Sequence, residues 1–167
     1  MTQEELNMIL DKHRKWLNDE EGGGERAYLR EANLRGADLS ETDLRRAKLC
    51  RANLRRADLR RVNFSETDLR RASLNEADLR RADLRRAKLS EAYLGGADLC
   101  GANLDYSCWP LWCGSLDVKV DARIARQLAY HFCRLDCDDP EYLEARKAIT
   151  EFANGFHRVD ECGRIEA

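Results

Sequence analysis

A five-residue periodicity constrains the fold of this chain more than any other feature. Sixteen consecutive units fill residues 27–106 without an insertion, beginning AYLRE ANLRG ADLSE TDLRR. The central residue of every unit is leucine except at Phe64, and the residue two places before it is Ala, Thr or Val. The other three positions are mostly polar. A chain of this kind repeats one small structural unit many times.

A period of five fits neither a regular helix nor a flat strand. On an α-helix, five residues advance the leucines by about 140° around the axis, so no apolar stripe forms. On a flat strand, successive leucines would point to opposite faces because five is odd. The conflict disappears if the chain turns a corner once per unit and each central Leu points inward. The predicted fold is therefore a β-solenoid whose coils pair with the coils above and below.

The A-(D/N)-L-x-x units resemble those of the pentapeptide-repeat family. The resemblance covers 80 of the 167 residues. It implies a mainly β fold, a right-handed quadrilateral β-helix of about four coils with four units in each coil. The expected inward ladder of the middle coils is Leu49, Leu54, Leu59, Phe64, Leu69 and Leu74.

With four units in each coil, stacking also sorts the outward side chains into vertical ladders, such as Asp38, Asp58, Asp78 and Asp98. Residues 45–86 hold 14 basic and 6 acidic side chains. One interpretation is a solvated surface on which arginines offset stacked aspartates. The functional interpretation is a surface that docks an acidic partner or phosphates. Its candidate residues are Arg55, Arg56, Arg60, Arg61, Arg80 and Arg81.

Direct nucleic-acid binding is not expected at this band, because acids are interleaved with the arginines and no exposed aromatic side chain lies among them.

Residues 1–26 predict an N-terminal helix over residues 2–18, followed by a glycine-rich joint at Gly22–Gly24. Leu6, Ile9, Leu10, His13, Trp16 and Leu17 follow the spacing of an amphipathic helix. An open solenoid end exposes unpaired backbone, so we expect this helix to cap the first coil. The alternative is a docking helix for a partner or a second copy.

Residues 107–167 predict an aromatic plug, formed by Trp109, Leu111 and Trp112, and a C-terminal helical cap. One helix is expected over about 121–135. Asp139 as N-cap and Pro140 as first helical residue predict a second helix that ends near Ala153. Two short helices cannot bury their apolar stripes alone, so they should pack as a hairpin on the tower or on a second subunit. The second arrangement would make a homodimer through the C-terminal helices.

Four cysteines form the one ligand-type pattern, C-x4-C-x19-C-x3-C, at Cys108, Cys113, Cys133 and Cys137. A tetrahedral zinc site needs four such ligands, and His131 could replace one of them. The spacing is looser than that of paired C-x2-C sites, so neither a metal nor a cofactor is expected. Buried reduced thiols and a redox pair are the alternatives.

No Ser-His-Asp motif, phosphate-binding glycine loop or HExxH motif occurs, so the chain is not expected to be an enzyme. The N-terminus lacks a signal peptide, and no apolar run approaches the length of a membrane span. A cytoplasmic location without membrane contact is therefore expected.

The expected function is a rigid protein-interaction or scaffold module with an unidentified protein partner. The family resemblance implies an alternative, DNA-mimic-type binding of a type II topoisomerase such as DNA gyrase. That mimicry needs an acidic surface, whereas residues 27–106 carry 17 basic and 13 acidic side chains. A zinc- or redox-sensing module that uses the C-terminal cysteines is the third hypothesis.

Overall fold

The computed structural model describes residues 1–18, 23–108 and 117–166. The chain divides into two compact units, Met1–Lys119 and Val120–Ala167. The first unit contains helix α1 and the repeats, and the second contains helices α2, α3 and α4. The expected aromatic plug of Trp109, Leu111 and Trp112 lies outside the described residues.

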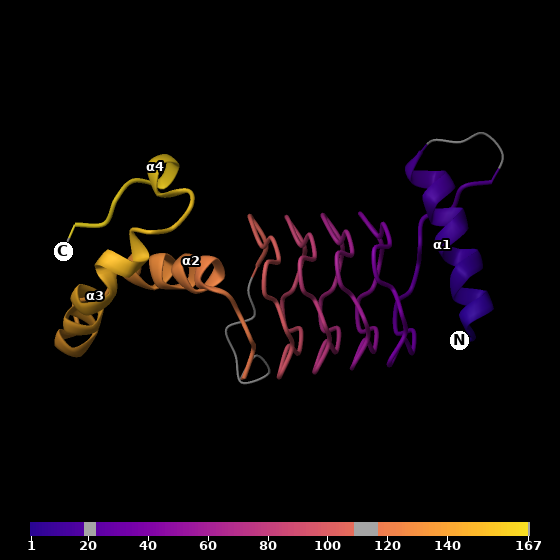
Figure 1. The fold of residues 1–167 in the computed structure, drawn as a ribbon, viewed down its shortest axis with the longest axis horizontal. Coiled ribbons are helices and arrows are strands. Elements are labelled where there is room, and N and C mark those ends of the chain that lie inside the picture. Colours follow the sequence, from indigo (N-terminus) through magenta and orange to yellow (C-terminus); the bar gives the residue numbers. More distant parts are fainter. Residues whose placement is uncertain (19–22, 109–116, 167) are drawn as a thin grey trace. The chain divides into compact units, whose positions relative to one another are not determined.

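The repeats wind into stacked coils of four units each (Figure 1). The residue before each central Leu pairs in parallel with its equivalent one coil later, as in Asp38 with Asp58 and Asp58 with Asp78. Each of these pairings is an isolated bridge, and the regular elements of the described residues are helices alone. The expected coils that pair with their neighbours are present, but regular strands are not found in the described residues, because a turn follows each bridge.

In the middle coils, the N–H of the residue before the central Leu bonds to the preceding coil, and the N–H of the central Leu bonds to the following coil. The N–H of Asp58 donates to the carbonyl of Ala37 in the preceding coil over 3.0 Å. The N–H of Leu59 donates to the carbonyl of Asp78 in the following coil over 2.8 Å. Because buried backbone N–H and C=O groups need hydrogen-bond partners, these bonds to the preceding and the following coil determine the register of the stack.

A tight turn closes each unit. The N–H of Val62 donates to the carbonyl of Leu59 over 3.2 Å, and the third residue of this turn, Arg61, has a φ of 56°. Positive φ at this position is typical of a type II turn. Its N–H donates to the carbonyl of Arg80 in the next coil over 3.0 Å, which ties the corner to the stack.

The Asp or Asn before the central Leu satisfies the remaining N–H group of the unit. Asp58 Oδ1 accepts the backbone N–H of Arg60 over 3.2 Å. The same side-chain bond forms in every unit that has Asp or Asn there. These residues are favoured at that position because their short side chains can reach a backbone N–H two residues on.

The core is a column of leucines and alanines inside the coils. The side chains of Leu49, Leu54, Leu59, Phe64, Leu69 and Leu74 are all 0% exposed. Burying one such side chain contributes about 1.5–3 kcal/mol, so the column is the main source of stability in this unit.

Helix α1 spans Gln3–Leu17 and lies against the first coil (Figure 1). Thr2 caps its N-terminus in a capping box with Glu5. The buried residues of the helix are Leu6 and His13.

The second unit begins with α2, Ala122–Cys133, whose N-cap Asp121 accepts the N–H of Ile124 over 3.0 Å. Helix α3, Pro140–Ala153, has Asp139 as its N-cap, and α4 is a single turn at Val159–Cys162. These elements share an apolar cluster of Tyr130, Cys133, Ala153, Phe156 and Ile165. No helix in residues 1–18, 23–108 and 117–166 has the length and apolar character that a membrane span requires.

Candidate functional site

The corner of each unit presents two adjacent outward side chains, and they make different ion pairs. The first follows the central Leu and, where it is Arg in a unit with Asp before that Leu, reaches the Asp of its own unit. Arg80 is typical: its Nε donates to Asp78 Oδ1 over 2.8 Å and its Nη2 to Asp78 Oδ2 over 2.5 Å. This contact lowers the pKa of Asp78, against the opposing effect of its partial burial. The Asp–Leu–Arg sequence therefore builds a preorganised fork at the corner.

The second corner side chain is on the left-handed residue and pairs along the stack, with the equivalent residue one coil away. In five cases a Glu and an Arg lie one coil apart there so that opposite charges meet, as in Arg71 with Glu91 over 2.8 Å. The other pairs of this kind are Arg46–Glu66, Arg51–Glu31, Arg56–Glu76 and Arg61–Glu41. Because these pairs are exposed to water, each contributes little to stability by itself.

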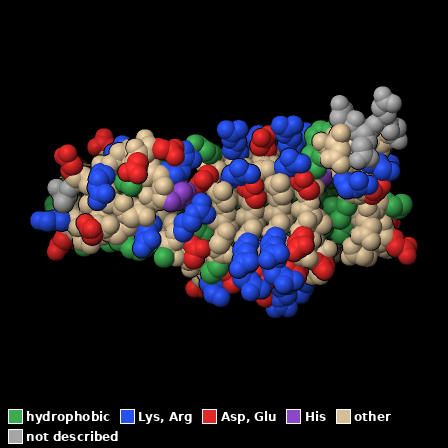
Figure 2. Space-filling model, turned by 45° about the horizontal axis from the view of Figure 1, so that its top comes forward, with side chains coloured by type: hydrophobic (Ala, Val, Ile, Leu, Met, Phe, Trp, Pro, Cys, Tyr) green, Lys and Arg blue, Asp and Glu red, His purple; other side chains and the backbone are tan. Residues whose placement is uncertain are grey.

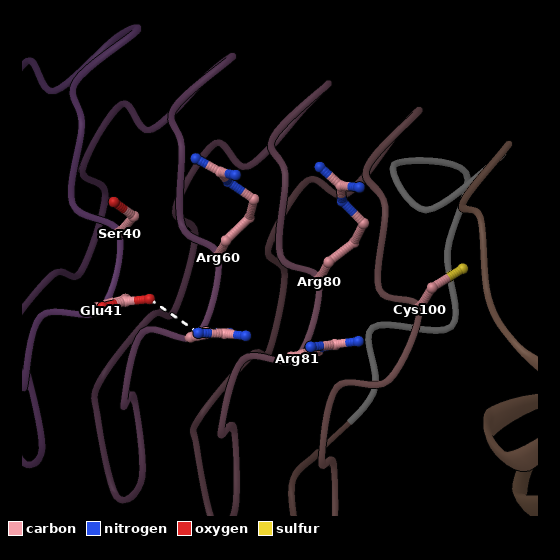
Figure 3. A pocket seen from close by; sticks show the side chains of 7 residues that line it. Ser40, Glu41, Arg60, Arg80, Arg81 and Cys100 are labelled. Carbon is pink, nitrogen blue, oxygen red and sulfur yellow. Dashed lines mark hydrogen bonds and ion pairs between the residues drawn. The ribbon is translucent and has the colours of Figure 1, made fainter.

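At one corner of the stack these two rows of side chains border a groove of about 570 Å³ (Figure 3). The lining residues are Ser40, Glu41, Arg60, Arg61, Arg80, Arg81 and Cys100. Figure 3 shows Arg60 and Arg80 extending in the same direction from successive coils, with Arg81 in the second row.

Four of the six candidate arginines therefore lie together, at Arg60, Arg61, Arg80 and Arg81. Arg55 and Arg56 lie at the preceding corner of the coil, where both bind Glu76. Sequence reasoning did not single out Ser40, Glu41 or Cys100 as members of the site. Their signal was present in the stacking period of 20 residues. Positions 40, 60, 80 and 100 share one column, and positions 41, 61 and 81 share the adjacent one.

The groove is basic but partly neutralised. Its lining holds four arginines and one glutamate, and Glu41 pairs with Arg61 over 3.0 Å. Asp58 and Asp78 hold Arg60 and Arg80 from outside the lining. Figure 2 shows basic and acidic side chains interspersed over the stacked coils. Guanidinium groups held in this way bind two oxygens of an oxyanion through paired N–H donors, so the groove can bind carboxylates or phosphates.

The candidate zinc ligands do not come together as a set that the structure describes. Cys108 is exposed in the first unit, and Cys137 is exposed in the second. Cys133 is buried, and its thiol donates weakly to the carbonyl of Arg146 over 3.9 Å. Cys113 lies outside the described residues, and within those residues no group of three or more metal-binding side chains occurs.

The family model of pentapeptide repeats matches residues 27–65 and 67–105, with eight copies. No protein with a curated description matches the chain.

Among solved structures, a pentapeptide repeat protein of the Arabidopsis thaliana thylakoid lumen is 26% identical, with a TM-score of 0.51. The match covers 75% of this chain and 76% of that one. A pentapeptide repeat protein from the cyanobacterium Cyanothece 51142 is 31% identical, with a TM-score of 0.46 over 53% of this chain. The present chain spans 56% of that protein.

QnrB1, a plasmid-mediated fluoroquinolone resistance protein, is 19% identical over 71% of this chain and 75% of its own, with a TM-score of 0.24. A likeness this distant carries no argument about function. The residues that the family model matches are those that form the stacked coils. Residues 27–65 and 67–105 of this chain are therefore pentapeptide repeats.

Proposed function

We propose that this protein is a non-enzymatic interaction module that binds an acidic segment of a protein partner in the arginine groove. The observation that carries the proposal is the convergence of Arg60, Arg61, Arg80 and Arg81 on one groove. Each of these residues lies on a corner that is hydrogen-bonded to the next coil, so the donors need little ordering when a ligand binds.

The groove suits a protein segment better than a nucleic-acid strand. Glu41 is in its lining, and Asp58 and Asp78 contact its arginines, so a continuous phosphate backbone would meet carboxylates along its path. None of the lining residues is aromatic, so bases would have no stacking platform. A short acidic segment needs only the local positive charge.

The alternative, DNA-mimic-type binding to a topoisomerase, would need an exposed acidic face. A row of four stacked aspartates follows the coils at Asp38, Asp58, Asp78 and Asp98. Arg60 and Arg80 neutralise the two central members, and Lys119 contacts Asp98 over 3.1 Å. Inhibition of gyrase supercoiling at near-stoichiometric protein would nevertheless favour this alternative.

The proposal is tested with a fluorescein-labelled oligoglutamate peptide, whose binding is followed by fluorescence anisotropy at low salt. We expect the Arg61→Gln/Arg81→Gln double variant to weaken binding by about tenfold or more. The matched control is Arg55→Gln/Arg56→Gln, which removes the same charge at the preceding corner and should weaken binding much less. Equal losses in the two variants would show that only net charge matters and would overturn the groove as the binding site.

Four finer expectations accompany this proposal. The register of the parallel bridges and the turn in every unit support a right-handed quadrilateral path for the coils. We also propose a cytoplasmic location.

Self-association through the C-terminal helices is supported by exposed apolar side chains in the second unit, at Phe132, Leu135, Leu143 and Phe152. Light scattering at high protein concentration tests it. Metal analysis of freshly purified protein tests the zinc-sensing alternative.

A further inference from the structure

The arginines on the left-handed corner residues follow a pairing rule. Seven arginines occupy such positions, namely Arg46, Arg51, Arg56, Arg61, Arg71, Arg81 and Arg86. Five of them pair with a glutamate one coil away. Arg86 instead lies over the ring of Tyr106, 5.7 Å from its centroid.

Arg81 departs from this rule. Within the described residues, it makes neither an ion pair with a glutamate nor a contact with an aromatic ring. Its neighbour in the preceding coil is Arg61, which is bound to Glu41 over 3.0 Å. Its neighbour in the following coil is Gly101, which has no side chain to offer and a φ of 76°. A Cβ atom at Gly101 would lie 3.2 Å from Arg81 Cγ, so the missing side chain would stand directly beside Arg81.

The charges around Arg81 favour an anion that carries more than one negative charge. Arg80 and Arg61 line the same groove, and Asp78 and Glu41 hold them in place. Each carboxylate leaves part of its arginine's five N–H donors unused. A carboxylate ligand has one charge and two oxygens, whereas a phosphate monoester has a charge of about −1.5 to −2 and three acceptor oxygens. The three guanidinium groups of Arg61, Arg80 and Arg81 match the phosphate monoester better.

We propose that Arg81, with Arg61 and Arg80, forms a subsite for a phosphorylated side chain within the acidic segment of the partner. This inference rests on the proposed function, because it assigns one residue of the bound segment to one place in the groove. Gly101 is part of the subsite: its missing side chain leaves the Arg81 guanidinium open to the ligand.

The test compares two fluorescein-labelled peptides, a serine flanked by glutamates and the same peptide with phosphoserine. We expect phosphorylation to tighten binding to the wild-type protein by about tenfold or more. Gly101→Glu places a carboxylate where Glu91 stands beside Arg71, so it should pair with Arg81 and abolish the gain from phosphorylation. Glutamate occupies the same left-handed position at Glu31, Glu41, Glu66, Glu76 and Glu91, so the fold should accept it.

The matched control is Gly96→Glu. Gly96 has a φ of 69° at the same position of another corner, and its new Cβ would face Glu76 rather than an arginine of the groove. It changes the net charge equally and should retain the gain from phosphorylation. Thermal unfolding followed by circular dichroism verifies that both variants fold.

The outcomes separate the two proposals. If both peptides bind the wild-type protein equally and Arg61→Gln/Arg81→Gln weakens both, the phosphate subsite is wrong and the acidic groove stands. If neither peptide binds, the proposed function itself fails. Equal loss of the phosphorylation gain in Gly101→Glu and Gly96→Glu would also overturn the subsite, because net charge alone would then explain it.

Discussion

The backbone N–H of Ala27 donates to Nδ1 of His13 over 3.1 Å, and both residues are buried where α1 meets the first coil. This bond requires an unprotonated Nδ1, and burial lowers the pKa of His13 from its usual 6.5. The nearby charges of Asp43, Arg26 and Arg45 also act on the ring. In later units the equivalent N–H donates to the carbonyl of the central Leu one unit earlier, as that of Ala32 does to Leu29. His13 therefore replaces the preceding unit as the acceptor for the first N–H of the repeats.

The first prediction concerns pH. Well above pH 6.5, His13 is neutral in both the folded and the unfolded chain and adds no pH dependence. Below that pH, the unfolded chain takes up a proton that the folded one resists, so the free energy of unfolding should fall as the solution is acidified. His13→Asn keeps an acceptor without this titration and should flatten the fall. Urea unfolding at several pH values measures both; an unchanged slope in His13→Asn would contradict the assignment.

The second prediction concerns Gly24, which passes close to helix α1. A Cβ atom there would lie 2.4 Å from the backbone N of Trp16, an atom that cannot move without distorting the helix. Gly24→Ala should therefore release α1 from the first coil, detected as faster hydrogen exchange over residues 3–17. Gly36→Ala is the matched control: it meets no atom within 4 Å, and its φ of 66° should cost only about 1 kcal/mol. Equal protection of α1 in both variants would count against this contact.

The third prediction concerns the core. Leu69 is 0% exposed in the middle of the leucine column, so Leu69→Arg should abolish cooperative unfolding because a charge would be buried without a partner. Leu69→Ala should retain the fold at a cost of about 2–5 kcal/mol. Tyr28→Arg introduces the same residue at a side chain that is 71% exposed and should change little. A sharp thermal transition in Leu69→Arg would show that the register is wrong.

The fourth prediction separates the two roles of Asp68, which accepts the N–H of Arg70 and pairs with its guanidinium over 2.8 Å. The Arg70 hydrogen bond lowers the pKa of Asp68, so this contribution to stability is present above its usual 3.8 and is lost as the pH falls through the folded value. Asp68→Asn should remove only the ion pair. Asp68→Ala should cost about 0.5–1.5 kcal/mol more, measured by urea unfolding, because the backbone acceptor is lost as well. Equal stability of the two variants would mean that the backbone bond contributes nothing.

The fifth prediction concerns Cys108. Burial would raise the pKa of its thiol, but hydrogen bonds from the Ser90 hydroxyl and the Leu89 N–H outweigh burial and lower it. The Leu89 N–H approaches Sγ to 3.3 Å. Iodoacetamide should therefore alkylate Cys108 faster than Cys137 or Cys162, which are also exposed, and mass spectrometry of the peptides measures the rates. Ser90→Ala should slow Cys108 selectively; labelling at the same rate as Cys137 would contradict the prediction.

Much of the tower could be predicted because its interactions repeat with a fixed spacing. The odd period of five requires a corner in every unit, and the leucines can then be buried only on the inside. The role of Asp and Asn before Leu was not predicted, although a bond to the N–H two residues on is a local property of those residues. The coils pair through isolated bridges because the turns leave no room for longer ladders.

The linear sequence determined the coil register, the buried column and the set of exposed arginines, since each depends only on spacing along the chain. It could not determine which arginines are neutralised by a carboxylate, because the contact with a residue one coil away depends on how the coils stack. Arg61 and Arg81 have the same position in their units, yet only Arg61 has a glutamate beside it. The contact of His13 with Ala27 likewise depends on how a separate helix packs on the first coil. Only the tertiary structure decided these contacts, because the energies of ion pairs and buried hydrogen bonds depend on distances between residues far apart in sequence.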